Sequence, residues 1–490
     1  MVDSAGVSPT GGRVLALDLG SSSVRAAVLA GPGLDPVPPG PARRPVRLVQ
    51  RADGSAEFDP AGYLAVTAAA IDELAGRGDL AGVTAAGMST QWHSLIGVDR
   101  RGDPTGPGLS WLDTRPALTG PGPADPAAYH ARTGAWWHPL YWPARLRWLA
   151  AAGAHAHRWQ GLPEYLTERL LGEAGASVSA ASGTGALDTV HCGWDAEALA
   201  LAGVPEPALP PLLPPGWTGR LLPAYARRWP DLAATAWAEP VGDGAASAIG
   251  SGCLGPERLS VTVGTSAAVR LVTPGAPDPG PRVWRYRVDR ARSVLGVAYS
   301  GGGNLHAWLA ALLVPQGVDE PALAALAPGE HGLVALPDQA GHRPPHEPRG
   351  AGGAVLGLRL STRAVDLAAA VLEGLCHEVA GGARAVDPTG QGAPVLSGGA
   401  VRASPWLARR LGAALPPGAV QARAAETALR GAAMLATGCY PPPRLEPVPV
   451  TAAERAAMAA AGERHRAARE ALGQAPFGCA GRRMSCDRPT

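Results

Sequence analysis

The stretch RVLALDLGSSSVRAAVL, residues 13–29, decides the fold of this chain. Its apolar run Val14 to Leu17 predicts a buried strand, and the run Ala26 to Leu29 predicts a second strand. The glycine and three serines between the runs form a hydroxyl-rich turn, so we expect a β-hairpin. Such a turn can offer N–H and O–H donors to a phosphate group. This stretch alone is equally consistent with an ordinary hairpin that has an Asx-type turn.

Two charged side chains flank the predicted turn. Asp18 stands at the polar end of the first strand, and its carboxylate is the kind of ligand that a hydrated Mg²⁺ accepts. Arg25 opens the second strand and carries a permanent positive charge. The turn is therefore a candidate site for phosphate and metal.

A second copy of the pattern lies half a chain away. The stretch LSVTVGTSAAVRLV, residues 259–272, again contains an apolar strand, a turn at Gly264-Thr265-Ser266 and a second strand with an arginine. The spacing from glycine to arginine is one residue longer than in the first copy, and no aspartate corresponds to Asp18. Two copies predict a duplicated domain with a phosphate site between the halves.

The composition narrows the class of protein. A chain of 490 residues can form two or more domains with cores of their own. The net charge of +2 indicates no polyanionic partner such as a nucleic acid. The sequence contains no lysine, which excludes a Walker-type phosphate loop. Its six cysteines form no C-x-x-C pair, which argues against a zinc site.

The sequence also indicates where in the cell the protein is located. No apolar run reaches transmembrane length, and residues 1–12 lack the apolar region of a signal peptide. We therefore expect a cytoplasmic protein with reduced thiols and no membrane partner.

The stretch PVGDGAASAIGSG, residues 240–252, contains a candidate catalytic carboxylate. We expect Val241 to end a strand, Gly242-Asp243-Gly244 to form a tight turn, and a helix of small residues to follow. Glycine on both sides of Asp243 lets a ligand approach the carboxylate closely. The motif alone favours the simpler interpretation, in which Asp243 caps the helix.

Aromatic side chains suggest where a sugar would bind, because they combine apolar faces with polar edges. Trp92 and His93 follow a strand predicted at 83–88, and the stretch 133–141 ends with Tyr141. A capped strand end is the simpler explanation for His93 alone.

The stretch SWLDTR, residues 110–115, is a third candidate contact. If this segment is extended, Trp111, Asp113 and Arg115 share one face and suit a polyol. The alternative is a surface ion pair between Asp113 and Arg115, which would contribute little.

The second half contains two further glycine-rich turns. SGGGN, residues 300–304, follows a predicted strand and precedes a helix, an arrangement that binds anions and nucleotides. SGGA, residues 397–400, follows a strand predicted at 393–396. Periodicity predicts helices at 63–74, 162–171, 305–313, 365–380, 405–415, 426–435 and 451–472, and a disordered tail at 474–490.

These motifs together resemble those of the FGGY carbohydrate kinases. The resemblance runs from about Arg13 to Ala436, and seven short motifs occur in family order: DLGSSSVR (18–25), WLDTR (111–115), GDGA (242–245), VGTS (263–266), SGGGN (300–304), SGGAVRASPW (397–406) and ETALRGAA (426–433). The resemblance implies an α/β fold of two actin-like (ribonuclease H-like) ATPase domains with a central ligand cleft. We expect an N-terminal domain at 13–254, with sugar, Mg²⁺ and phosphate contacts, and a nucleotide-contacting C-terminal domain at 255–440, followed by a C-terminal helix at 441–473.

The family resemblance also implies a role for individual residues. Asp18 would contact Mg²⁺, and Asp243 would be the catalytic base and touch the substrate. The remaining nucleotide contacts would be Ser21, Ser22 and Arg25 at the phosphates, Gly264 and Thr265 in a second phosphate loop, and Gly303, Gly398 and Gly399 at the nucleoside.

The implied activity is transfer of the γ-phosphate of ATP to a hydroxyl of a sugar, polyol or aldonic acid, by a monomer or homodimer. The alternatives are a catalytically silent sugar-binding or regulatory protein on the same fold, and a chaperone-like or actin-like ATPase. Retention of both Asp18 and Asp243 argues against the first alternative, because binding alone needs neither. The tryptophan-rich stretch 136–148 and the GDGA motif argue against the second.

Local patterns look most like those of gluconokinase-type members, which suggests gluconate as the substrate. The patterns are WHS (92–94), SWLDTR (110–115) and TGAWWHPLY (133–141). On this resemblance the substrate contacts would be Trp92, His93, Asp113, Arg115 and Tyr141, with Arg115 as a partner for a carboxylate. The chain departs from these members at Trp92 (usually Met), Arg145 (usually Lys) and Gly341-His342-Arg343 (usually Gly-Glu-Arg).

Overall fold

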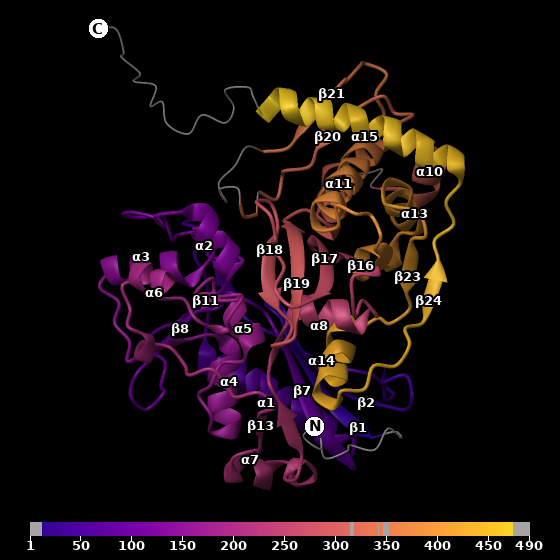
Figure 1. Cartoon of the computed structure of the whole chain (residues 1–490). Coiled ribbons are helices and arrows are strands. Elements are labelled where there is room, and N and C mark those ends of the chain that lie inside the picture. Colours follow the sequence, from indigo (N-terminus) through magenta and orange to yellow (C-terminus); the bar gives the residue numbers. More distant parts are fainter. Residues whose placement is uncertain (1–11, 314–317, 342, 346–351, 474–490) are drawn as a thin grey trace, which may run out of the picture.

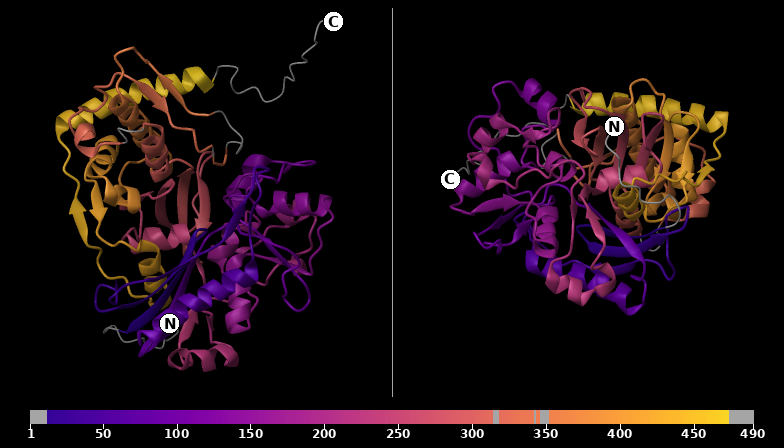
Figure 2. Two further views of the ribbon diagram at one scale, coloured as in Figure 1. Left: turned by 180° about the vertical axis from the view of Figure 1, so that it is seen from behind. Right: turned by 60° about the horizontal axis from the view of Figure 1, so that its bottom comes forward.

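The computed structural model describes residues 12–313, 318–341, 343–345 and 352–473. Two large mixed sheets form the body of the molecule, one in each half of the chain (Figure 1). Figure 2 shows, from behind and from below, that the N-terminal half and the C-terminal half lie side by side as two lobes. The predicted tail at 474–490 and His342 lie outside the described residues.

The first sheet is built around the predicted hairpin of β1 (Arg13–Leu19) and β2 (Ser23–Ala30), which pair antiparallel with Asp18 opposite Arg25. On the other side of β1 lies the parallel strand β7 (Val83–Thr90), and β14 (Ala236–Ala238) pairs parallel with β7. The sheet is completed by β3 (Asp35–Pro36), β4 (Ala42–Pro45), β13 (Thr218–Gly219) and β15 (Val241–Gly242).

The second sheet repeats this order. Its hairpin is formed by β16 (Arg258–Val263) and β17 (Ala267–Pro274), and β22 (Ala393–Ser397) pairs parallel with β16. Next comes the parallel strand β23 (Val420–Ala422), while β19 (Arg292–Tyr299) covers the far side of β17. The edges are β18 (Trp284–Arg287) and β24 (Leu445–Pro447). This repetition confirms the predicted duplication and the two-domain actin-like α/β fold.

Helices cover these sheets, and each of the seven helices predicted from periodicity is present, although the one predicted at 365–380 extends to Val386. The α-helices are α1 (Pro60–Gly76), α2 (Pro126–Thr133), α3 (Trp142–Ala151), α4 (Leu162–Leu171), α5 (Val178–Ser182), α6 (Ala196–Ala202), α7 (Pro223–Arg228), α8 (Asp243–Gly250), α9 (Gly303–Leu312), α10 (Glu320–Ala324), α11 (Ala364–Val386), α12 (Gly399–Ala403), α13 (Pro405–Ala414), α14 (Thr427–Thr437) and α15 (Ala452–Gly473). Short 3₁₀ helices lie at Glu206–Ala208 and Pro230–Leu232. The smaller strands are β5 (Leu48–Gln50), β6 (Ala56–Phe58), β8 (Ile96–Val98), β9 (Gly108–Leu109), β10 (Arg158–Gln160), β11 (Leu187–Asp188), β12 (Gly193–Trp194), β20 (Val334–Leu336) and β21 (Ala354–Leu356).

Local chemistry explains where these helices end. At α4 the side chain of Glu164 accepts a hydrogen bond from the N–H of Gly161 (2.8 Å), and Gly172 closes the helix in the left-handed conformation with φ of 81°. Two details differ from the sequence prediction. The Gly242-Asp243-Gly244 segment is no separate turn, because α8 begins at Asp243 itself with Gly242 as its N-cap. The segment expected to be helical from 441 carries β24 first, and α15 begins at Ala452.

Helices α8 and α14 join the two halves. They pack without intervening side chains: a Cβ on Gly250 would lie 1.8 Å from the carbonyl oxygen of Thr427, and one on Gly431 would lie 1.8 Å from that of Ala246. On its other face α14 contacts β7 and β1 of the first sheet (Figure 1). The helix that starts with Asp243 is therefore held between the two sheets.

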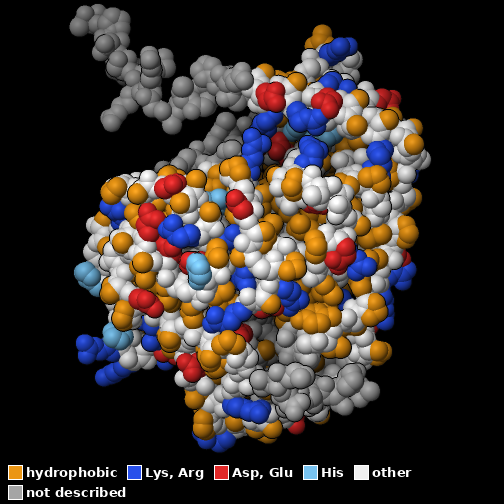
Figure 3. Space-filling model, in the orientation of Figure 1, with side chains coloured by type: hydrophobic (Ala, Val, Ile, Leu, Met, Phe, Trp, Pro, Cys, Tyr) orange, Lys and Arg blue, Asp and Glu red, His pale blue; other side chains and the backbone are white. Residues whose placement is uncertain are grey.

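On the face shown in Figure 3, arginines and carboxylates are interspersed, with no wide area of one sign. Within the described ranges, no helix combines the length and the apolar character needed to cross a bilayer.

Candidate active site

A cavity of about 1090 Å³ is lined by residues from both halves of the chain. Its walls come from the turn between β1 and β2, the start of α8, the turn between β16 and β17, and the starts of α9, α12 and α14. The hairpin turns, which are related by the duplication, thus face the same space. The sequence-predicted residues that line it are Asp18, Ser22, Arg25, Asp243, Gly264, Thr265, Gly303, Gly398 and Gly399.

The remaining predicted residues are not among the described residues that line this cavity. They are Ser21, Trp92, His93, Asp113, Arg115 and Tyr141. Conversely, sequence analysis missed several polar residues of the lining, namely Arg43, Ser247, Arg270, Asn304, Glu426 and Thr427. The arginine of the second hairpin was visible in the repeated pattern, but only its position opposite α8 shows that it reaches the cavity.

Asp18 and Arg25 form an ion pair that a third residue extends. The carboxylate of Asp18 accepts hydrogen bonds from Arg25 Nη2 and from Ser89 Oγ (3.0 Å). Arg25 Nη1 donates to Glu426 Oε2 (2.6 Å), and Glu426 comes from the other half of the chain. Burial raises the pKa of Asp18 even though Arg25 opposes this shift. The predicted phosphate contact Arg25 is therefore already neutralised by two carboxylates.

Hydrogen bonds and close backbone packing hold three glycine-rich turns of the second half together. Gly303 N–H donates to the carbonyl of Gly264 (2.7 Å), and Asn304 N–H donates to that of Thr265 (3.2 Å). A Cβ on Gly302 would lie 2.6 Å from Ser266, so the turns approach as closely as they do only because this residue is glycine. Gly398 has φ of 101° and would place a Cβ 2.3 Å from the carbonyl oxygen of Val263. These turns expose backbone to the cavity, as a phosphate or nucleoside site requires.

Asp243 faces the same cavity as the first residue of α8. Its Oδ1 accepts a hydrogen bond from Gly244 N–H (2.7 Å). Burial raises the pKa of Asp243 to about 6, and the charge of Asp18 adds to this rise while Arg270 opposes it. A carboxylate with a pKa near neutrality is suited to accept a proton during a reaction.

The two carboxylates fit a divalent cation. Asp18 and Asp243 face one cavity, and each has a pKa raised by burial, so a nearby cation would stabilise both charged forms. In the described part of the chain, no cluster of three or more histidine, cysteine or acidic side chains is arranged to hold a metal by itself. This fits Mg²⁺, which proteins usually bind through one or two carboxylates together with water and substrate phosphates.

Next to Asp243 lies a group of buried aromatic rings. Trp92 packs against the glycines that flank Asp243, since a Cβ on Gly242 would lie 1.9 Å from its ring. Its Nε1 donates to the carbonyl of Ser179 (2.9 Å), and its ring meets Tyr286 of β18 edge-on, 4.9 Å between centroids. The hydroxyl of Tyr286 hydrogen-bonds with that of Tyr141 (2.8 Å). The group therefore joins predicted sugar contacts to a strand of the second half.

His93 belongs to this group as a neutral imidazole. Its ring lies 5.5 Å from Tyr141 and 5.7 Å from Tyr286. Burial lowers the pKa of His93 to about 3, and its Nδ1 lies 2.5 Å from the carbonyl oxygen of Gly183. With Nδ1 assigned as the donor, Nε2 is left as an acceptor.

Asp113 and Arg115 pair with one another. Asp113 Oδ2 accepts from Arg115 Nη2 (2.6 Å) and from Ala56 N–H (3.1 Å), and the same Nη2 donates to Glu57 Oε1 (2.6 Å). Residues 111–112 form a turn, with Asp113 N–H donating to the carbonyl of Ser110 (3.1 Å), and residues 110–115 are not part of a strand. Trp111 instead stacks with Arg343, whose guanidinium carbon lies 4.0 Å from the ring centroid.

Arg145 connects the stretches that carry these residues. It is fully buried and donates to the carbonyls of His93 (2.9 Å), Pro139 (3.2 Å) and Asp113 (3.3 Å). Burial lowers the pKa of Arg145 to about 10.

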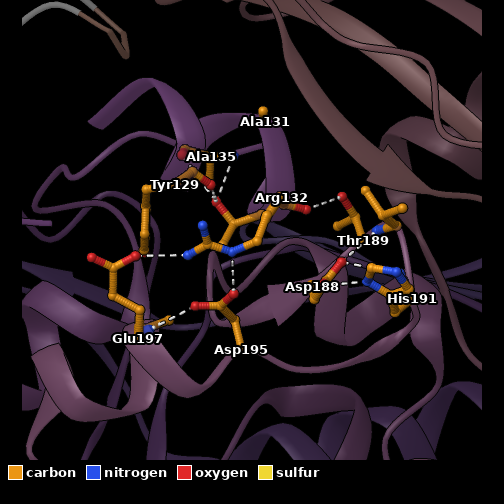
Figure 4. A network of polar contacts seen from close by, with 12 residues as sticks. Tyr129, Ala131, Arg132, Ala135, Asp188, Thr189, His191, Asp195 and Glu197 are labelled. Atoms are coloured by element: carbon orange, nitrogen blue, oxygen red, sulfur yellow. Dashed lines mark hydrogen bonds and ion pairs between the residues drawn. The ribbon is translucent and has the colours of Figure 1, made fainter. Parts of the chain in front are cut away.

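A second network, drawn in Figure 4, holds α2 in place just before the 133–141 stretch. In it Arg132 pairs with Asp195 (2.9 Å) and Glu197 (2.7 Å).

Two family models match most of this chain, up to residue 438. The model "FGGY family of carbohydrate kinases, N-terminal domain" matches residues 13–250, and "FGGY family of carbohydrate kinases, C-terminal domain" matches residues 259–438.

Individual relatives include enzymes with different names. The chain is 25% identical to a gluconokinase from Bacillus subtilis over 320 residues, which is 60% of this chain and 61% of that protein. It is 32% identical to a xylulose kinase from Streptomyces rubiginosus over 372 residues, 72% of this chain and 74% of that protein. Among solved structures, a gluconate kinase from Lactobacillus acidophilus superposes with a TM-score of 0.85 at 21% identity, covering 95% of this chain and 99% of that one.

Proposed function

Because the chain belongs to the FGGY family of carbohydrate kinases, we propose that it transfers the γ-phosphate of ATP to a hydroxyl of a sugar, polyol or aldonic acid. The observation that carries this proposal is the placement of Asp243. A buried carboxylate with a pKa of about 6 shares one cavity with Asp18 and with glycine-rich turns from the other half.

In the proposed mechanism Asp243 accepts the proton of the attacking hydroxyl, which is a poor nucleophile until that proton has an acceptor. Asp18 would hold Mg²⁺, which would neutralise charge on the phosphates. Ser22 and Arg25 on one hairpin, and Gly264 and Thr265 on the other, bind the phosphates from opposite sides. Gly303, Gly398 and Gly399 bind the nucleoside. Closure of the two halves around the substrates would exclude water.

We further propose gluconate, or a similar linear polyhydroxy acid, as the substrate. The support is the pattern of residues 92–94, 110–115 and 133–141 and the similarity to proteins named gluconokinase. Trp92, His93 and Tyr141 would contact the sugar, since their rings adjoin Asp243 through Trp92. Asp113 and Arg115 would act indirectly, by fixing the loop that carries Trp111.

The proposal is tested by measuring ATP consumption with gluconate, other aldonates, xylulose and glycerol. A kcat/KM for gluconate or another aldonate at least tenfold above those for xylulose and glycerol supports the proposed substrate class. Turnover of xylulose or glycerol well above gluconate would refute the aldonate while retaining the kinase. Binding of sugars without any ATP consumption would support the silent sugar-binding alternative instead.

Three predictions on organisation accompany this function. We place the domain boundary between Leu254 and Gly255, in the segment that joins α8 to β16. The cytoplasmic location and a monomeric or homodimeric state stay predictions, which cell fractionation and analytical ultracentrifugation would test.

A further inference from the structure

The arginines that line the cavity differ in what they already bind. Arg25 is neutralised by Asp18 and Glu426, Arg43 lies 3.9 Å from Glu426, and Arg402 donates to the carbonyl of Ala425 (3.0 Å). Arg270 has no such partner. Within the described part of the chain, its Nε and Nη1 are buried and make no hydrogen bond.

An unpaired buried guanidinium is costly, because each N–H has lost water without gaining an acceptor. Folded proteins tolerate such groups where a ligand supplies the missing acceptor. Burial lowers the pKa of Arg270 and Asp243 opposes that shift, so the guanidinium and this carboxylate lie close enough to interact.

The position of Arg270 is fixed by the fold. It lies on β17, opposite Ser260 of β16 and Gly296 of β19, and its side chain extends to the first turn of α8. A Cβ on Gly244 would lie 2.7 Å from Arg270 Nε and 2.6 Å from the Trp92 ring. Because Gly244, directly after Asp243, has no side chain, the guanidinium of Arg270 can occupy this space.

We propose that Arg270 is a catalytic residue that donates hydrogen bonds to the phosphoryl group during its transfer to the hydroxyl held by Asp243. This inference rests on the proposed kinase function. It assigns the stabilisation of charge on the transferred phosphoryl group to a residue of the second half of the chain. In the step itself, the bond from the γ-phosphorus to the leaving oxygen of the nucleotide breaks as the bond to the substrate oxygen forms. The substrate proton passes to Asp243, and Arg270 remains protonated throughout.

A carboxylate of the substrate is the other possible acceptor. In a six-carbon aldonate, however, the carboxylate lies at the opposite end of the carbon chain from the primary hydroxyl. Arg270 adjoins the residue after Asp243 and lines the cavity with both phosphate loops. It is therefore placed at the reacting end of such a substrate.

The test compares Arg270→Met and Arg270→Lys with wild-type enzyme. Arg270→Met should lower kcat roughly 10²- to 10³-fold, as loss of a charge-stabilising donor does. The dissociation constant of ADP should stay within threefold of the wild-type value. A non-hydrolysable ATP analogue should bind wild-type enzyme more tightly than ADP does, and Arg270→Met should abolish this difference. Arg270→Lys should retain part of the activity, and added guanidinium ion should partly restore the activity of Arg270→Ala.

A matched control is Arg287→Met on β18 of the same sheet. Arg287 is buried as a whole residue, and it donates to the carbonyls of Gly275 (2.7 Å) and Asp289 (3.0 Å) and to Ser293 Oγ (2.9 Å). Its removal should lower the midpoint of thermal unfolding and leave the kcat of the folded enzyme unchanged. Arg270→Met should lower this midpoint less than Arg287→Met does, because it removes buried N–H groups that have no acceptor.

Two outcomes would overturn the inference. Arg270→Met with kcat within threefold of wild type would show that no transition-state contact is lost. A rise in KM confined to sugar acids, with neutral polyols unaffected, would assign Arg270 to the substrate carboxylate. If wild-type enzyme consumes no ATP with any sugar, the proposed function fails. The comparison of ADP with the ATP analogue still tests whether Arg270 contacts the terminal phosphate.

Discussion

Replacing Asp243 by asparagine should make the protein inactive and more stable at once. Asparagine keeps the shape of the side chain and an oxygen that accepts from Gly244 N–H, but it cannot accept a proton from the substrate. Loss of a general base lowers kcat by roughly 10²- to 10⁴-fold. ATP affinity should change little, since the phosphates are bound by other residues.

The gain in stability follows from the pKa of Asp243, which burial raises from its ordinary value of 3.8 to about 6. Below pH 3.8 the carboxyl is neutral in both the folded and the unfolded chain, so its titration costs nothing. As pH rises from 3.8 to 6 the unfolded chain ionises first, and the folded state loses stability. Above pH 6 the full penalty of about 3 kcal/mol applies, at 1.36 kcal/mol per pKa unit. Asparagine avoids this penalty.

Thermal and urea unfolding at pH 8 and pH 4 measure this effect. Asp243→Asn should raise the free energy of unfolding at pH 8 by up to about 3 kcal/mol and lose most of that gain at pH 4. Asp113→Asn is the control, because it removes a buried carboxylate that is paired with Arg115. It should destabilise the protein at pH 8. Near-normal kcat in Asp243→Asn, or a stability gain independent of pH, would refute the assignment of Asp243 as a buried base.

Three further predictions concern the same cavity. The kcat/KM of the wild-type enzyme should fall as pH drops through about 6, because this ratio follows the pKa of Asp243 in the free enzyme and protonation removes the base; a plot of kcat/KM against pH that stays flat down to pH 5 would contradict this. Glu426→Gln should lower the dissociation constant of ATP several-fold, because it frees Arg25 Nη1 from its 2.6 Å ion pair; isothermal titration calorimetry measures this, and weaker binding would show that Glu426 itself supports the site. Gly242→Ala should raise the KM for the sugar more than that for ATP, because the added Cβ would lie 1.9 Å from Trp92 and displace its ring; equal effects on both KM values would argue against a sugar site at Trp92.

Local sequence patterns determined the framework of this protein. The apolar runs on either side of Gly20 and of Gly264 specified two hairpins, and both form with the predicted strands. Periodicity likewise predicted a helix at 162–171, and α4 has these bounds, with Gly172 closing it at a positive φ. These features could be predicted because strand periodicity, turn conformation and helix capping depend on residues within a few positions of one another.

The duplicated hairpins also imply that their turns meet, and most of the predicted phosphate and nucleoside contacts do line one cavity. Local patterns left the partners of the charged side chains open. Arg115 could bind a substrate carboxylate or pair with Asp113, and the structure shows the pair with Asp113, extended by Glu57. Arg25 looked like a free phosphate ligand, but Glu426, 401 residues away, neutralises it.

Only the tertiary structure decided which charges are paired and which are left without a partner. Arg25 and Arg270 occupy similar places in two similar hairpins, yet the first has two carboxylate partners and the second has buried N–H groups without an acceptor. The pKa of a carboxyl such as Asp243 depends in the same way on the residues that remove water from it. Burial and ion pairing depend on side chains that the fold brings together from distant positions in the sequence. A local sequence pattern therefore cannot identify those partners.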